Sequence, residues 1–145
     1  MSRRPWSRRV VGVGAFLGCL LASSCGSAGP KLHPVRGQVL FQDKPAEGAL
    51  VVFHPVRADA EAVPPSGIVG ADGSFTLASR TPSDGAPAGE YVVAIVWFDK
   101  EIQIDANNAE LKNRLPAHYG DAKTSPLRAQ VKEGPNQLEP FRLKN

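Results

Sequence analysis

Histidine and cysteine are the side chains that most often bind metals, and the chain contains three histidines and two cysteines. His33, His54 and His118 lie far apart in the sequence. None has a second histidine at the His-x-His or His-x-x-x-His spacing that places two ligands side by side. We therefore expect no zinc site in this chain.

A second candidate site is a group of oxygen-bearing side chains between residues 99 and 108. They are the ligand types that calcium prefers: Asp99, Glu101, Asp105, Asn107 and Asn108. The group lacks the Asp-x-Asp-x-Asp-Gly pattern, whose glycine lets a loop curl around the ion. We expect a solvated loop here and no metal or other cofactor.

A nucleophilic site would need a serine beside a histidine and an acid. Ser125 follows His118 by seven residues, but Pro126 comes directly after it and the segment has no Gly-x-Ser-x-Gly turn. We expect the protein not to be an enzyme.

The positive charge of the chain is concentrated at its N-terminus. The net charge is +3, yet residues 1–24 contain four arginines and no acid. Without those four, 13 of the 17 basic side chains remain against 14 acidic ones, so the rest of the chain is near −1. Nucleic-acid binding needs a basic surface that follows phosphates, and this balance excludes it.

The arginines precede an apolar stretch at 10–21, which is too short to span a membrane. Small residues follow, in the order Leu21-Ala22-Ser23-Ser24-Cys25. A basic region, an apolar region and a small-residue cleavage site predict a secretory signal peptide at residues 1–24.

The five residues that end at Cys25 resemble the lipobox of bacterial lipoproteins. The resemblance implies a diacylglycerol on the Cys25 thiol, cleavage before Cys25 and acylation, for example by palmitate, of the new amine. Ala22 replaces the commoner leucine of the motif. Cleavage at Cys19 would leave a shorter apolar region, and it stays open with an unlipidated secretory signal as an alternative.

The lipid would hold the mature protein on a membrane without a spanning helix. Gly26 stands where bacterial lipoproteins retained at the inner membrane often have aspartate, which favours the outer membrane. The paired arginines are compatible with twin-arginine export, but an ordinary basic region explains them as well. Residues 25–34 are expected to be the lipidated cysteine and a short tether.

From residue 35 onward the apolar residues alternate with polar ones, and turn residues recur at regular spacing. Loops are expected at 56–66 and 99–117, with a helical turn or two within 105–115. The Asp72-Gly73 pair predicts a tight hairpin. The pattern predicts seven strands, at 35–42, 49–54, 66–70, 75–77, 91–98, 127–132 and 137–143. We therefore predict an all-β fold, a β-sandwich over residues 35–143.

Several motifs resemble carboxypeptidase-regulatory-like domains: 35–39, 44–53, 71–77 and 87–93. The ending, with Leu115-Pro116-Ala117-His118-Tyr119-Gly120-Asp121, Thr124-Ser125-Pro126-Leu127 and Gly134-Pro135-Asn136, is similar to small bacterial lipoproteins that carry this domain alone. The resemblance implies a seven-stranded, transthyretin-like (prealbumin-like) sandwich without catalytic residues. Transthyretin-like hydrolases end in Tyr-Arg-Gly-Ser, and this chain does not.

Two functional hypotheses follow. The first is a membrane-anchored, non-catalytic module of the cell envelope that contacts another protein through the loops 56–66 and 99–117. The alternative is a carbohydrate-binding module, because Trp97, Phe98 and Tyr119 could stack on sugar rings at one end of the sandwich. In either case the partners are the membrane and an envelope protein or glycan.

Overall fold

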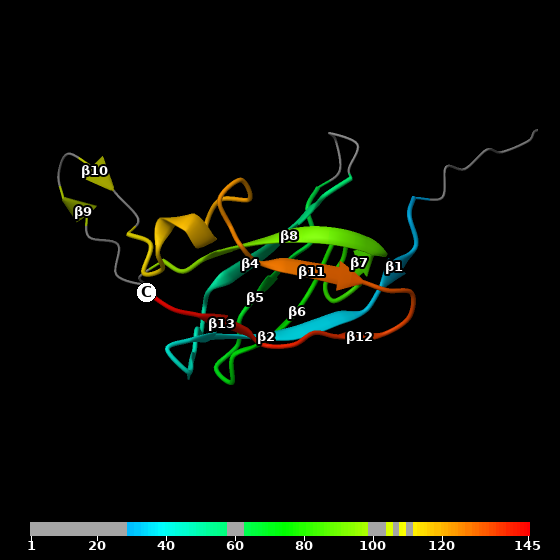
Figure 1. The fold of residues 1–145 in the computed structure, drawn as a ribbon, viewed down its shortest axis with the longest axis horizontal. Helices are drawn as coiled ribbons and strands as arrows, with labels where there is room; N and C mark the ends of the chain where they lie inside the picture. The colour runs from blue at the N-terminus through cyan, green and yellow to red at the C-terminus, as the bar shows by residue number, and fades with distance from the viewer. Residues whose placement is uncertain (1–28, 58–62, 99–103, 106–107, 110–111) are drawn as a thin grey trace, which may run out of the picture.

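The computed structural model describes residues 29–57, 63–98, 104–105, 108–109 and 112–145 (Figure 1). A first sheet of four antiparallel strands forms because two apolar runs pair along their length. β4 (Leu50–Pro55) pairs with β8 (Gly89–Val96) over six residues, from Leu50 opposite Val96 to Pro55 opposite Tyr91. β5 (Ser66–Ile68) and β11 (Arg128–Val131) complete the sheet, in the order β11-β8-β4-β5.

A second sheet is built around β2 (Val35–Phe41), whose alternate residues Val35, Gly37 and Val39 are buried. On one side β2 pairs antiparallel with β6 (Ser74–Thr76) and with the short β3 (Lys44–Pro45). On the other side it pairs in parallel with β12 (Asn136–Gln137) and β13 (Phe141–Leu143). The first long strand and the last two strands therefore lie side by side.

The two sheets pack face to face across a cluster of four aromatic rings. Phe53 and Tyr91 come from the first sheet, and Phe75 and Phe141 come from the second. The ring centroids of Phe53 lie 5.6–6.4 Å from those of the other three, a distance typical of favourable aromatic pairs. The predicted all-β fold and its sandwich arrangement are confirmed.

The Asp72-Gly73 turn connects the two sheets rather than two neighbours of one ladder. Gly73 has a φ of +83°, as predicted, and Gly70 and Ser74 are joined across the turn by a backbone hydrogen bond. However, β5 pairs with β4 whereas β6 pairs with β2. The hairpin is closed only near its ends, where Ser66 and Ala78 exchange two backbone hydrogen bonds.

Several predicted boundaries need correction. Helical turns were expected within 105–115, but β9 (Ile104–Asp105) and β10 (Asn108–Ala109) form an antiparallel pair there. The helix of the described residues is a single 3₁₀ turn, η1 (Ala117–Tyr119), which follows Pro116. The expected last strand, 137–143, is interrupted before β13, where Pro140 cannot donate to a ladder.

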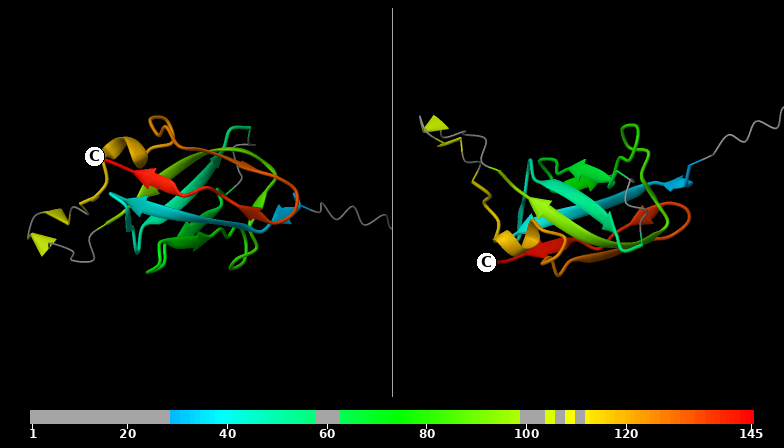
Figure 2. Two further views of the ribbon diagram at one scale, coloured as in Figure 1. Left: turned by 60° about the horizontal axis from the view of Figure 1, so that its bottom comes forward. Right: turned by 90° about the horizontal axis from the view of Figure 1, so that it is seen from above.

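The expected tether, residues 25–34, is also shorter than predicted. β1 (Leu32–His33) pairs antiparallel with β7 (Ala86–Pro87) in a separate two-stranded sheet, so strand structure begins three residues before the predicted boundary at 35. Figures 1 and 2 place β1 and β7 at one end of the molecule and η1 and the C-terminus at the other. We call these the β1 end and the η1 end. No helix in the described part of the chain is long and apolar enough to cross a membrane.

We expect Phe53→Ala to destabilise the fold by about 3–5 kcal/mol, because its ring is fully buried between the sheets and its loss would leave a cavity. Phe98→Ala removes the same atoms from a ring that is 40% exposed, so its effect should be clearly smaller, about 1 kcal/mol. Chemical denaturation of both variants measures the difference. Equal losses would contradict the central place of the aromatic cluster.

Candidate functional site

Ser125, a residue considered for nucleophilic chemistry, has a structural role. Its side chain is 3% exposed, its hydroxyl donates a 2.6 Å hydrogen bond to the Val93 carbonyl, and it accepts one from the Leu127 N–H. The hydroxyl proton is therefore engaged by a main-chain carbonyl of β8. This geometry fixes the segment before β11 against the first sheet.

The three histidines occupy different surroundings. His33 is 5% exposed, and its Nδ1 accepts a 2.9 Å hydrogen bond from the Gly134 N–H, so it is not the surface residue expected in a tether. His54 is half-buried in β4, and exposed His118 packs its ring 4.1 Å from that of Tyr119. Within the described ranges, no three histidine, cysteine or acidic residues gather in a way that could hold a metal. The calcium candidates lie outside the described residues, except for the backbones of Asp105 and Asn108.

The three aromatic residues of the carbohydrate hypothesis lie beyond β8 and in η1. The Arg114 guanidinium carbon sits 3.8 Å from the centre of the Trp97 ring, whose Nε1 donates to the Glu47 carbonyl. Tyr119 is 8% exposed, and its hydroxyl accepts a hydrogen bond from the Lys144 N–H. Phe98 is the most exposed of the three, and it follows the strand rather than ending it. A glycan site at these residues stays a prediction.

The two loops of the contact hypothesis do not begin at the same end of the sandwich. The 56–66 loop leaves β4 at Pro55, which pairs with Tyr91 near the start of β8. The 99–117 loop follows the opposite end of β8. The two loops are therefore anchored on opposite ends of the first sheet.

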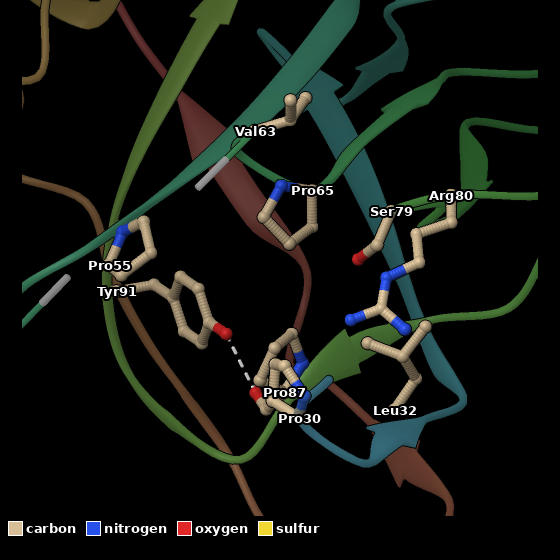
Figure 3. A pocket seen from close by; sticks show the side chains of 9 residues that line it. All are labelled: Pro30, Leu32, Pro55, Val63, Pro65, Ser79, Arg80, Pro87 and Tyr91. Carbon is tan, nitrogen blue, oxygen red and sulfur yellow. Dashed lines mark hydrogen bonds between the residues drawn. The ribbon is translucent and has the colours of Figure 1, made fainter. Parts of the chain in front are cut away.

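A cavity of about 340 Å³ lies at the β1 end (Figure 3). Most of its lining is apolar, with four prolines from four separate segments: Pro30, Pro55, Pro65 and Pro87. The apolar wall is completed by Leu32, Val63 and the Tyr91 ring. The polar wall consists of Ser79 and Arg80. In Figure 3 these two polar residues lie across the cavity from Pro55 and Tyr91. This volume is within the range of small-molecule sites.

Hydrogen bonds hold the wall in place. The Tyr91 hydroxyl donates a 2.7 Å bond to the Pro87 carbonyl, and burial raises the pKa of this hydroxyl. The Ser79 hydroxyl donates to the Gly85 carbonyl at 2.6 Å. The Asp84 carboxylate accepts from the backbone N–H groups of Ser79, Arg80 and Thr81 at 2.6–2.9 Å. The loop that carries Arg80 is therefore fixed at both of its ends.

Arg80 is the one charged side chain among the lining residues. Its guanidinium lies so close to Gly29 that a Cβ added to Gly29 would collide with it. None of the described residues forms an ion pair or a hydrogen bond with this guanidinium. The cavity thus combines an apolar wall with a positive charge that no described residue pairs with, an arrangement suited to an amphiphile with an anionic group.

The sequence-based reasoning missed this site. Its residues come from the tether, the 56–66 loop, the 79–85 loop and the four strands β1, β4, β7 and β8, so no local spacing joins them. The only signal in the sequence is the number of prolines that flank strand ends, which also has an ordinary explanation in turns.

Comparison with known proteins adds little to this picture. No protein-family model matches the chain, and no curated protein matches it in sequence. Among solved structures, a DUF3823 family protein from Parabacteroides merdae is similar, with 15% identity and a TM-score of 0.37 over 79% of this chain. A 9R-lipoxygenase from Cyanothece is similar over 78% of it, with 16% identity and a TM-score of 0.39. This chain covers only 46% and 16% of their respective lengths, and at these TM-scores neither supports a conclusion.

We expect Gly85→Ala to loosen the β1 end. Gly85 has a φ of +90°, and a Cβ there would collide with the His33 carbonyl oxygen of β1. Gly134 has the same φ, but an added Cβ meets nothing within 4 Å. Gly134→Ala should therefore cost only about 1–2 kcal/mol of backbone strain. Denaturation and hydrogen exchange at Leu32 and His33 should show a larger loss, and faster exchange, for Gly85→Ala alone.

The loop that carries Arg80 should be sensitive to acid. The hydrogen bond from the Ser79 N–H, followed by those from Thr81 and Arg80, lowers the pKa of Asp84 to about 2. A lowered carboxyl pKa stabilises the loop above about pH 4, and this contribution is lost as the pH falls toward 2. Amide hydrogen exchange of residues 79–81 should rise over that interval. Asp84→Asn should abolish the transition, whereas Asp43→Asn, an exposed carboxylate elsewhere, should retain it.

Proposed function

We propose that the protein is a non-catalytic β-sandwich that a lipid on Cys25 holds at a bacterial membrane, where it serves as a binding or structural module of the cell envelope. The observation that carries this proposal is the position of β1. Leu32 is already part of the folded domain, only seven residues after Cys25. Even fully extended, seven residues span about 25 Å, so an anchored domain would keep its β1 end near the membrane.

The chemistry of the described residues supports a non-catalytic function. The Ser125 hydroxyl donates a hydrogen bond to a main-chain carbonyl, and the His33 ring accepts a hydrogen bond from a backbone N–H. Both side chains are thereby used in holding the fold. The resemblance to carboxypeptidase-regulatory-like domains, which stand beside catalytic domains or alone, supports the same function.

The position of the two ends favours the η1 end for contact with a partner. It lies opposite β1, so it would face away from the membrane, and it presents Phe98 and Arg114 at the surface. The outer membrane is the favoured location because Gly26 follows the anchor. The partner is an envelope protein, and a glycan is the alternative.

We expect Cys25→Ser to abolish lipidation. The variant should accumulate as an uncleaved precursor, and mass spectrometry should find no diacylglycerol on its N-terminal peptide. Cys19→Ser is the matched control, since it removes the other cysteine and should be processed and anchored like the parent chain. A Cys25→Ser protein that is still cleaved before residue 25 and still carries lipid would refute the proposed anchor.

A further inference from the structure

We propose that the cavity at the β1 end binds an anionic phospholipid of the membrane in which the chain is anchored. Its apolar wall would receive the start of an acyl chain, and Arg80 would pair with the phosphate. This inference rests on the proposed function, because the Cys25 anchor is what brings the cavity to the lipid.

The apolar wall is open enough to receive a ligand. Val63 at its edge is 76% exposed, whereas Pro65 and Tyr91 behind it are buried. The hydroxyls of Tyr91 and Ser79 already donate to main-chain carbonyls. An acyl chain that covers this wall therefore leaves both hydroxyl protons satisfied, and burial of apolar surface favours binding.

Charge selects the headgroup. Figure 3 shows the Arg80 guanidinium directed toward the cavity, between Ser79 and Leu32. The nearest carboxylate along the loop belongs to Asp84. It accepts hydrogen bonds from three backbone N–H groups and does not pair with the guanidinium. A planar guanidinium binds a phosphate with two parallel hydrogen bonds.

The short segment between Cys25 and the cavity would hold the cavity near the membrane. Pro30, which lines the cavity, follows Cys25 by five residues, a span of at most about 17 Å. A cavity held this close to the anchor is within reach of headgroups in the same leaflet. A soluble partner would have to enter the narrow space between the domain and the membrane. The lipid is therefore the occupant that we favour.

The test is photo-cross-linking of the protein, purified in its cellular form, with a short-chain phosphatidylglycerol that carries a photoreactive group on one acyl chain. Labelled peptides are identified by mass spectrometry. Label is expected on the segments around Pro30, Val63 and Arg80. Glycerol phosphate, which lacks the chains, and monohexanoylglycerol, which lacks the phosphate, should each compete at least about tenfold less well than unlabelled lipid.

Two variants locate the site and one serves as control. Arg80→Gln and exposed Val63→Asp should each reduce labelling about tenfold. Arg142→Gln makes the same change in charge at the opposite end of the molecule, where Arg142 pairs with Asp43, and should label like the parent chain. Unchanged labelling of Arg80→Gln, label spread over the surface, or equal competition by glycerol phosphate would overturn the proposal.

The same samples separate this proposal from the proposed function. The mass of the N-terminal peptide shows whether Cys25 carries lipid. The cross-link shows whether the cavity binds a lipid that is added from solution. A lipidated protein without cavity label refutes the lipid site alone. Cavity label without modification of Cys25 supports the site and refutes the anchor.

Discussion

Contact between the two sheets across four aromatic rings is the interaction on which the rest of this structure depends. The described residues include no cysteine and no cluster of potential metal ligands, so the layers are held together by packing. Phe53 touches the other three rings, two of them from the opposite sheet. Because β4 and β8 form the wall that holds Phe53 and Tyr91, the cavity at the β1 end keeps its shape only while the sheets stay packed.

Much of the fold could be predicted because burial leaves a period-two pattern in the sequence. β2 was found this way, β4 and β8 were found as continuous runs of apolar residues, and the Asp72-Gly73 turn was found from its backbone requirement. β1 could not be found, because two residues before Pro34 are too short for a period. The early end of β8 is set by a partner far away in the sequence, Asn113, whose side chain accepts a hydrogen bond from the Trp97 N–H and whose backbone Phe98 faces.

The candidate site was less predictable than the fold. The motif residues that pointed to a family turn out to hold the scaffold. Asn136, for example, accepts from the Lys132 N–H and donates to the carbonyls of Lys132 and Gly134, all at 2.8 Å. Arg80, by contrast, belongs to no motif. Its role follows from the apolar residues that the fold brings around it, which come from segments far apart in the sequence. No local sequence pattern could therefore reveal it.

The parallel pairing of β2 with β12 and β13 has a consequence for how the protein reaches its final form. The first long strand finds its last partners only when the final ten residues are available. Until then one side of β2 presents free amide and carbonyl groups, which attract other extended chains. A chain halted before residue 136 therefore keeps an open sheet edge, and contacts so distant in sequence slow the closing step. Protection of this side of β2 therefore waits until residues 136–143 have been added to the chain.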